Sequence, residues 1–445
     1  MTVNKPPNGE RWHRQITGHE YFAPVQWRRR AALWAGGIIV GVAAILFARG
    51  SDLAFALFRT LVSQIPWLPL LLTPAVFALI AALTNGRFRQ TRGSGIPQVI
   101  AAIEVEDQGF RQRLLSLPIT VGKMALTLIG LAGGGSIGRE GPTVHVGAGL
   151  MYWVGKRFGF TEPKALSRFI LAGGGAGIAA AFNAPLAGVV FAIEELAGSF
   201  ENRVSGIILT AVIFAGAVSL GVLGNYAYFG RVDAQMQLSQ AALAVLACGI
   251  CGGIGGGLFV RAISLSDHGA FAWLVRCRRR APVLFAAICG LALAALGVFT
   301  GSAIFGTGYE EARGLIQATH GEATTFWVLK LTANVLSYWA GVPGGIFSPA
   351  LAVGAGMGHS LAGLLSAADS SAVALLGMAA FLAGVTQTPI TAAVISLELT
   401  ANHSMIIPLL AVSLLARGIS SLVCHAPVYR AFADRIIAEH ERAAD

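Results

Sequence analysis

The chain is dominated by long apolar runs that glycine and proline repeatedly interrupt. A straight transmembrane helix needs about 20 apolar residues, and several of these runs are too short, too long or too broken for one crossing. Interrupted backbone is tolerated at membrane depth only where it lines a cavity or is covered by protein. The sequence therefore predicts an all-α polytopic membrane protein with broken and re-entrant helices. The runs lie near residues 31–48, 53–84, 114–155, 166–198, 205–228, 238–264, 281–305, 324–365, 372–399 and 404–424.

Charge is scarce and unevenly placed. Charged residues make up 12% of the 445 residues, whereas soluble domains carry about 25%. This excludes an ordinary cytosolic enzyme and a disordered chain. The net charge is +10, but the basic residues form short clusters between apolar runs, which is typical of cytoplasmic loops and not of a nucleic-acid partner. The clusters are Arg28 to Arg30; Arg87, Arg89 and Arg92; and Arg276 with Arg278 to Arg280.

The chain also resembles itself. A shift of 207 positions places Lys123 on Lys330, Gly138 on Gly345 and Pro142 on Pro349, and a shift of 204 places Pro185 on Pro389 and Glu194 on Glu398. We expect one integral membrane domain made of two repeats, residues 31–230 and 238–429. A cytoplasmic leader (1–30) precedes them and a cytoplasmic tail (430–445) follows. The basic clusters place equivalent first spans in opposite directions, which predicts an inverted repeat with a substrate site near the midplane.

Three segments combine a chain break with a following apolar helix. They are Gly93-Ser94-Gly95-Ile96-Pro97, Gly138-Arg139-Glu140-Gly141-Pro142 and Gly344-Gly345-Ile346-Phe347-Ser348-Pro349. Such breaks expose unpaired N–H groups at the positive end of a helix dipole. Three helix starts that converge would form an anion site without a fixed positive charge, which suits a transporter because a full charge is costly in hydrocarbon.

Glutamates stand at two critical places. Glu140 lies at one of the predicted helix starts. A carboxylate there either offsets the dipole or pairs with Arg139, or it competes with an anion for the same N–H groups. Glu194 and Glu195 end an apolar run. Glu194 has a counterpart in the other repeat, Glu398, which favours a shared structural role. Glu195 has none, and is either a proton-transfer station or a solvated helix end.

Other signals are weaker. Gly134-x-Ser136-x-Gly138 fits the serine-hydrolase pattern, which leaves an intramembrane hydrolase using Ser136 as a remote alternative. That pattern needs a strand–turn–helix setting and a histidine partner. His145 is expected to be packed or hydrogen-bonded. We find no metal-binding spacing and expect no metal and no cofactor.

Together, the motifs GSGIP, GREGP and GGIFxP and the terminal Pro427-Val428-Tyr429 resemble the CLC family of chloride channels and proton-coupled chloride transporters. The chain is similar to its prokaryotic members, which lack C-terminal regulatory domains. The resemblance implies an inverted-repeat fold and a homodimer with one ion path per subunit. It also implies an anion site formed by Ser94, Gly95, Tyr429 and the N–H groups of Ile346 and Phe347. Glu140 would be the external gate and Glu195 the internal proton-transfer residue.

The resemblance also separates the branches of that family. An acid at the position of Glu195 is common in exchangers and uncommon in channels. Ser94 favours chloride over nitrate, and the GSGIP motif with the terminal Tyr429 argues against the fluoride-exporting branch. The sequence therefore predicts a chloride/proton antiporter, not an enzyme, in the inner membrane with both termini in the cytoplasm. Its partners would be chloride, protons, lipid and a second copy of the chain. The main alternative is a passive chloride channel on the same fold, gated by voltage or pH.

Overall fold

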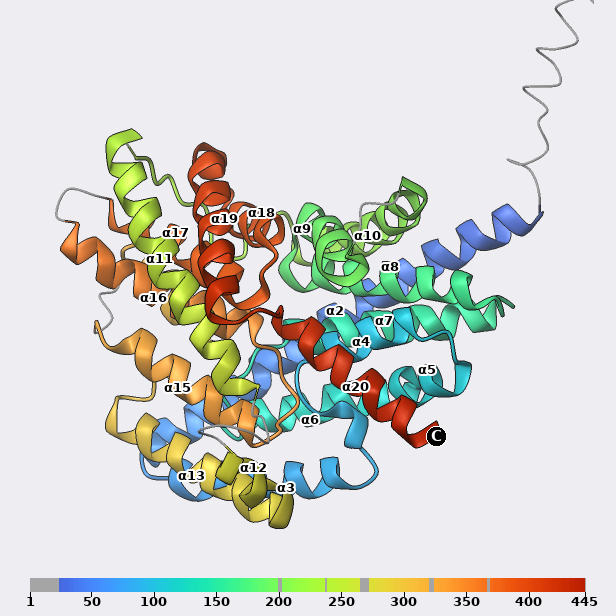
Figure 1. The fold of residues 1–445 in the computed structure, drawn as a ribbon, viewed down its shortest axis with the longest axis horizontal. Coiled ribbons are helices and arrows are strands. Elements are labelled where there is room, and N and C mark those ends of the chain that lie inside the picture. The colour runs from blue at the N-terminus through green and yellow to red at the C-terminus, as the bar shows by residue number, and fades with distance from the viewer. Residues whose placement is uncertain are drawn as a thin grey trace, which may run out of the picture.

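A computed structural model describes residues 24–198, 202–236, 238–264, 272–319, 324–365 and 369–444. Apart from one isolated bridge between Gly138 and Gly345, regular structure in these ranges is helical (Figure 1). Seven helices in the described part of the chain are long and apolar enough to cross a membrane. The predicted all-α membrane fold is confirmed.

The N-terminal part of the chain forms α2 to α10. The helices are α2 (Pro24–Gln64), α3 (Pro69–Asn85), α4 (Ile96–Glu104), α5 (Gln108–Leu115), α6 (Leu117–Ala132), α7 (Glu140–Arg157), α8 (Pro163–Phe182), α9 (Pro185–Phe191) and α10 (Asn202–Leu223), with a 3-10 turn, η1 (Arg89–Thr91), and a π-helical segment, η2 (Ala192–Ala197).

The C-terminal part forms α11 to α20. The helices are α11 (Leu238–Ile263), α12 (Ala272–Arg280), α13 (Pro282–Phe299), α14 (Tyr309–Ile316), α15 (Phe326–Trp339), α16 (Phe347–Leu364), α17 (Ser370–Thr386), α18 (Pro389–Thr400), α19 (Ile406–Val423) and α20 (Val428–Ala444), with a 3-10 turn, η3 (His403–Met405).

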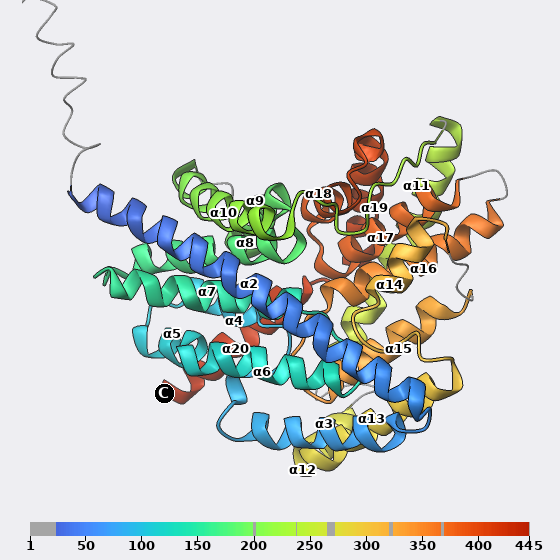
Figure 2. The ribbon, with the colours of Figure 1, turned by 180° about the vertical axis from the view of Figure 1, so that it is seen from behind.

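Helix α2 is unusually long. At 41 residues and about 1.5 Å per residue it extends roughly 60 Å, about twice the thickness of a bilayer core. It runs obliquely across the back of the molecule, over α7, α6 and α10 (Figure 2). Residues 24–30, which include the first basic cluster, already belong to this helix.

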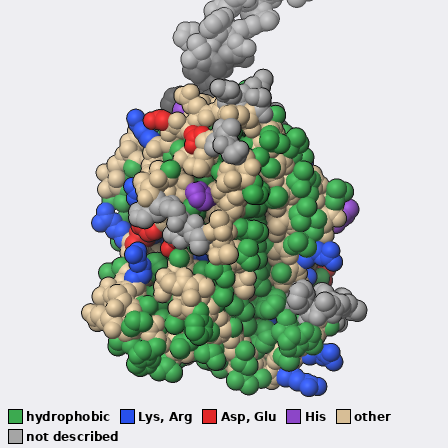
Figure 3. All heavy atoms as spheres, turned by 90° about the vertical axis from the view of Figure 1, so that its left-hand side faces the viewer, with side chains coloured by type: hydrophobic (Ala, Val, Ile, Leu, Met, Phe, Trp, Pro, Cys, Tyr) green, Lys and Arg blue, Asp and Glu red, His purple; other side chains and the backbone are tan. Residues whose placement is uncertain are grey.

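Equivalent helices of the two repeats pack against each other. Helix α3 contacts α13, α7 contacts α16 and α9 contacts α18. The main apolar core includes residues of α7, α9, α16 and α18 together with Ile346 and Tyr429. A second, smaller cluster lies between α3 and α13. One outer face is covered mainly by apolar side chains, with basic side chains at its margins (Figure 3), as expected for a surface in contact with lipid. The fold thus brings the breaks of both repeats to the centre.

Candidate functional site: three interrupted helices at the centre

The three glycine-containing breaks are joined through their backbones. Gly138 and Gly345, equivalent in the two repeats, exchange hydrogen bonds in both directions, with N···O distances of 2.7 and 2.6 Å. The N–H of Gly344 donates to the carbonyl oxygen of Gly93 at 3.2 Å. The predicted convergence of the three segments is therefore confirmed.

Each break ends where a helix begins. Helix α4 starts at Ile96 directly after Gly95, whose φ of 103° requires glycine, while α7 starts at Glu140 and α16 starts at Phe347 after Ile346. The first N–H groups of each helix have no intrahelical acceptor. Three positive helix ends thus surround one small volume, which suits an anion.

Two buried hydroxyl groups at the breaks have no hydrogen-bond partner in the protein. Ser94 and Tyr429 are each 1% exposed, and neither side-chain oxygen is satisfied. A Cβ placed on Gly141 would lie 2.2 Å from Ser94 Oγ, so Ser94 rests against the first turn of α7. The ring of Tyr429 stacks on that of Phe347, with centroids 6.1 Å apart. Buried polar groups normally have partners, and an anion would supply one to both hydroxyls.

Glu140 is fully buried between the two repeats. Its Oε1 accepts a 2.6 Å hydrogen bond from Ser348 Oγ of α16, while its Oε2 has no partner in the protein. The predicted position at a helix start is confirmed, but the suggested pairing with Arg139 is wrong. Arg139 Nη1 turns toward α2 and donates to Asp52 at 2.5 Å and to the carbonyl oxygen of Ala48.

Glu195 is also buried, with 9% of its surface exposed. It lies in η2 and accepts a 3.2 Å hydrogen bond from Thr388 Oγ1 in the link between α17 and α18. The alternative of a solvated helix end is therefore wrong. Tyr429 lies within electrostatic range of both Glu140 and Glu195.

Glu194 and Glu398 serve the structure, as their equivalence predicts. Glu194 accepts from the N–H groups of Ile390 and Thr391. Glu398 accepts from those of Leu186 and Ala187. Each thus satisfies donors in the first turn of a short helix of the opposite repeat.

Cavities approach the site from two directions. One, of about 570 Å³, is lined in part by Gly93 and Ser94. A second, of about 330 Å³, is lined in part by Arg139, Tyr228 and Asp52. Residues of two of the breaks therefore line two different cavities.

The weaker sequence signals have structural explanations. Ser136 lies in the loop between α6 and α7, and its N–H donates to Ser337 Oγ of α15. Its own Oγ has no hydrogen-bond partner. The strand–turn–helix setting and the histidine partner of a hydrolase serine are therefore missing at Ser136. His145 Nε2 is hydrogen-bonded to the carbonyl oxygen of Leu114, as expected. Lys123 Nζ donates to the Gly93 carbonyl oxygen, and Lys330 Nζ donates to that of Gly306. These two lysines hold loops.

Sequence reasoning missed four features. It did not identify Ser348 as the partner of Glu140, nor Asp52 as the partner of Arg139. It also missed the π-helical geometry around Glu195, and the loop Gly306-Thr307-Gly308, which Lys330 holds as Lys123 holds Gly93. The glycines of both loops have positive φ. The pattern Gly-x-Gly, which residues 306–308 share with residues 93–95, is the sequence signal that could have identified the second loop.

Comparison with known proteins agrees with this geometry. The H(+)/Cl(-) exchange transporters ClcA of Yersinia pestis bv. Antiqua (strain Angola) and of Yersinia pseudotuberculosis serotype O:3 (strain YPIII) are each 29% identical to the chain over 434 residues, covering 92% of it and 87% of their own length.

Solved structures share the fold. A slow cyanobacterial Cl-/H+ antiporter superimposes with a TM-score of 0.79 and 25% identity, over 93% of this chain and 99% of its own. A CLC-type fluoride/proton antiporter gives a TM-score of 0.79 at 22% identity, over 92% and 98%. The sequence model of a family described as voltage gated chloride channel matches residues 76–421. Since that match spans most of the chain and contains all three interrupted helices, the protein belongs to the CLC family.

Proposed function

We propose that the protein exchanges chloride for protons across the membrane, with Glu140 as the external gate and Glu195 as the internal proton-transfer residue. The observation that carries the proposal is the state of Glu140. A buried carboxylate stands at the positive end of α7, beside two unsatisfied hydroxyls, with one oxygen bonded to Ser348 and the other without a partner. Carboxylate and chloride compete for the same N–H donors, so protonation of Glu140 frees the site for the anion.

Glu195 supplies the second station. Its carboxylate is buried and accepts a hydrogen bond from Thr388 Oγ1. The neighbouring Glu194 is instead engaged with the first turn of α18. A buried acid that is not used as a helix cap is suited to carry a proton. The names of the relatives, exchange transporters and antiporters, support this assignment over a passive channel.

The anion is proposed to be chloride, bound by Ser94, Tyr429 and backbone N–H groups at Gly95, Ile346 and Phe347. Both hydroxyls are buried and have no partner in the protein, so each can donate a hydrogen bond to an anion. A hydroxyl donor and a helix start hold a monovalent halide without a fixed charge that would trap it.

The test uses purified protein in liposomes loaded with high chloride and diluted into low-chloride medium, with external pH followed as chloride leaves. We expect chloride exit from the unchanged protein to make the external medium alkaline. Glu140→Gln and Glu195→Gln should both abolish this alkalinisation, while Glu195→Gln should still pass chloride. Glu194→Gln is the matched control, because it makes the same change one residue away, and it should remain coupled. Chloride efflux without proton movement in the unchanged protein would make it a channel.

We further propose an inner-membrane location with both termini in the cytoplasm, and a homodimer. Arg92, Arg278 of α12 and Arg435 line the larger cavity, and α12 ends in further arginines. This accumulation of positive charge supports a cytoplasmic position for that side. Cys277 is an exposed cysteine on α12. Labelling of Cys277 by an impermeant maleimide in inverted but not in right-side-out vesicles is expected, with Cys277→Ser as the control. The mass of the purified detergent complex tests the dimer.

A further inference from the structure

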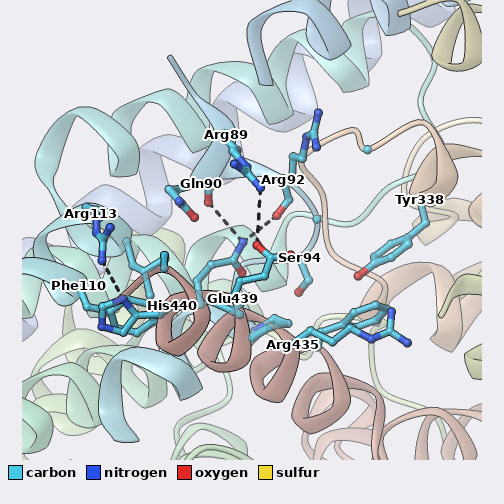
Figure 4. Close-up of a pocket in the computed structure, with 18 of the residues that line it drawn as sticks. Arg89, Gln90, Arg92, Ser94, Phe110, Arg113, Tyr338, Arg435, Glu439 and His440 are labelled. Carbon is cyan, nitrogen blue, oxygen red and sulfur yellow. Dashed lines mark hydrogen bonds and ion pairs between the residues drawn. The ribbon is translucent and has the colours of Figure 1, made fainter. Parts of the chain in front are cut away.

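The larger cavity has two unlike walls. Arg89, Gln90 and Arg92 lie on one wall and face Arg435, Glu439 and His440 of α20 on the other (Figure 4). The buried Ser94 also belongs to the lining. The lining also includes an apolar part formed by Tyr338, Phe432 and Ile436, in which the rings of Tyr338 and Phe432 lie 5.5 Å apart. A concave site with convergent polar groups and an apolar wall is the usual form of a small-molecule pocket.

Positive charge in this cavity exceeds what its own residues neutralise. Five arginines line it, but Glu439 is the one carboxylate in the lining. Glu439 lies 3.6 Å from Arg89, and both side chains are 67% exposed, so this ion pair is weak. The lining arginines are Arg89, Arg92, Arg113, Arg278 and Arg435.

Arg92 and Arg278 are the important pair. Arg92 donates to the side-chain oxygen of Asn85, but its buried Nε has no partner. Among the described residues, no hydrogen bond or ion pair engages Arg278, which lies beside Gly341 in the same lining. Burial first, and then the charges of Arg278 and Arg89, lower the pKa of Arg92 to about 10. Two half-buried guanidinium groups that repel each other are stabilised by an anion placed between them.

We propose that this cavity binds a multivalent phosphate anion, such as a nucleoside polyphosphate, between Arg92 and Arg278. A volume of about 570 Å³ far exceeds that of a halide and suits a drug-sized ligand. A guanidinium group can donate two parallel hydrogen bonds to phosphate oxygens. The wall formed by Tyr338, Phe432 and Ile436 offers a contact surface for an aromatic ring of the ligand. Because Gly93 and Ser94 belong to the lining, an occupant would close this approach to the anion site. That consequence rests on the proposed transport function, whereas the binding does not.

Binding is tested on the purified full chain in low-chloride buffer, by calorimetry with ATP and with inorganic tripolyphosphate. Saturable binding of both is expected, and tighter binding of ATP if the apolar wall is used. Arg278→Gln should weaken binding at least about tenfold, because one bidentate phosphate contact is lost. Arg276→Gln is the matched control, since Arg276 lies on the same helix, is exposed and does not line the cavity. Equal affinities in the two variants, or no binding, would overturn the proposal.

A second source of the same chemistry is a phospholipid headgroup. Vesicles containing phosphatidic acid are therefore added as a competitor at matched phosphate concentration. If the natural ligand is a soluble anion, as proposed, the vesicles should not displace ATP. Displacement of ATP by the vesicles would assign the cavity to lipid and overturn the proposal of a soluble ligand.

Transport supplies an independent readout. ATP is either enclosed in the liposomes or added outside. It should slow chloride exchange only by those protein molecules whose α20 side faces the ATP. Arg278→Gln should remove this inhibition. ATP binding without inhibition would overturn closure of the path. Absence of exchange in the ATP-free protein would instead refute the proposed function and leave the binding result intact.

Discussion

Glu194 and Glu398 occupy equivalent positions in the two repeats, and each carboxylate caps the helical segment that carries the other. Glu194, which follows α9, accepts from the first turn of α18, and Glu398, within α18, accepts from the first turn of α9. The two acids thus link the repeats by a reciprocal pair of contacts. Short helices of 7 and 12 residues depend on such caps because they have few internal hydrogen bonds.

Glu194→Gln and Glu398→Gln should therefore each lower the free energy of unfolding by about 1 kcal/mol. Thermal unfolding in detergent measures the loss. Glu162→Gln is the control, because Glu162 precedes α8 but makes no capping hydrogen bond. Equal midpoints in all three variants would show that the two caps do not stabilise the fold.

Ser348→Ala should make Glu140 easier to displace. The variant removes the hydroxyl that donates to Oε1 at 2.6 Å, and a hydrogen bond to a charged acceptor contributes about 1.5–3 kcal/mol. Chloride should then compete more effectively, so its apparent affinity should rise about tenfold or more. Titration of chloride binding by calorimetry measures this. Ser396→Ala, which removes a buried hydroxyl bonded to the Ala392 carbonyl oxygen, should leave the affinity unchanged; an equal rise there would contradict the assignment.

Asp52→Asn should destabilise the protein where Glu310→Gln does not. Both carboxylates line the smaller cavity, but only Asp52 is paired with Arg139, and no ion pair of Glu310 is found in the described part of the chain. Since Asp52 is 70% exposed, the loss should stay below about 1 kcal/mol. Denaturation of the two variants in parallel measures the difference in their free energies of unfolding. Identical values would show that the ion pair contributes nothing to stability.

Gly141→Ala should abolish chloride binding. An added Cβ would lie 2.2 Å from Ser94 Oγ and 3.2 Å from Gly345 Cα, which fills the volume between the breaks. Gly418→Ala adds the same atom to α19 where nothing lies within 4 Å, so it should bind chloride normally. Calorimetry on both proteins, after each is shown to be folded by circular dichroism, makes the comparison; normal binding by Gly141→Ala would place the anion elsewhere.

The sequence predicted those features that depend on local chemistry. Apolar runs identify membrane helices because a helix that crosses the hydrocarbon core needs about 20 apolar residues. Glycine and proline indicate where such helices begin. The repeat identified Glu194 with Glu398, and so predicted a structural role that the hydrogen bonds confirm. Glu140 was placed at a helix start for the same reason.

The sequence could not predict hydrogen-bond partners that are distant along the chain. Ser348 is 208 residues from Glu140 and Asp52 is 87 residues from Arg139, and no local pattern encodes which distant side chain a rotamer will meet. Arg139 and Glu140 are neighbours in sequence, which suggested a pair, but consecutive helical residues point about 100° apart.

The membrane setting and the helix starts could be predicted from hydropathy and from the conformations of glycine and proline, and the repeat from residues that recur at a fixed shift. Tertiary structure alone decided that Gly138 pairs with Gly345, that the hydroxyls of Ser94 and Tyr429 are buried without partners, and that Arg92 and Arg278 face one cavity. These relations arise when two repeats pack in opposite orientations, and the distances between their atoms are set by that packing.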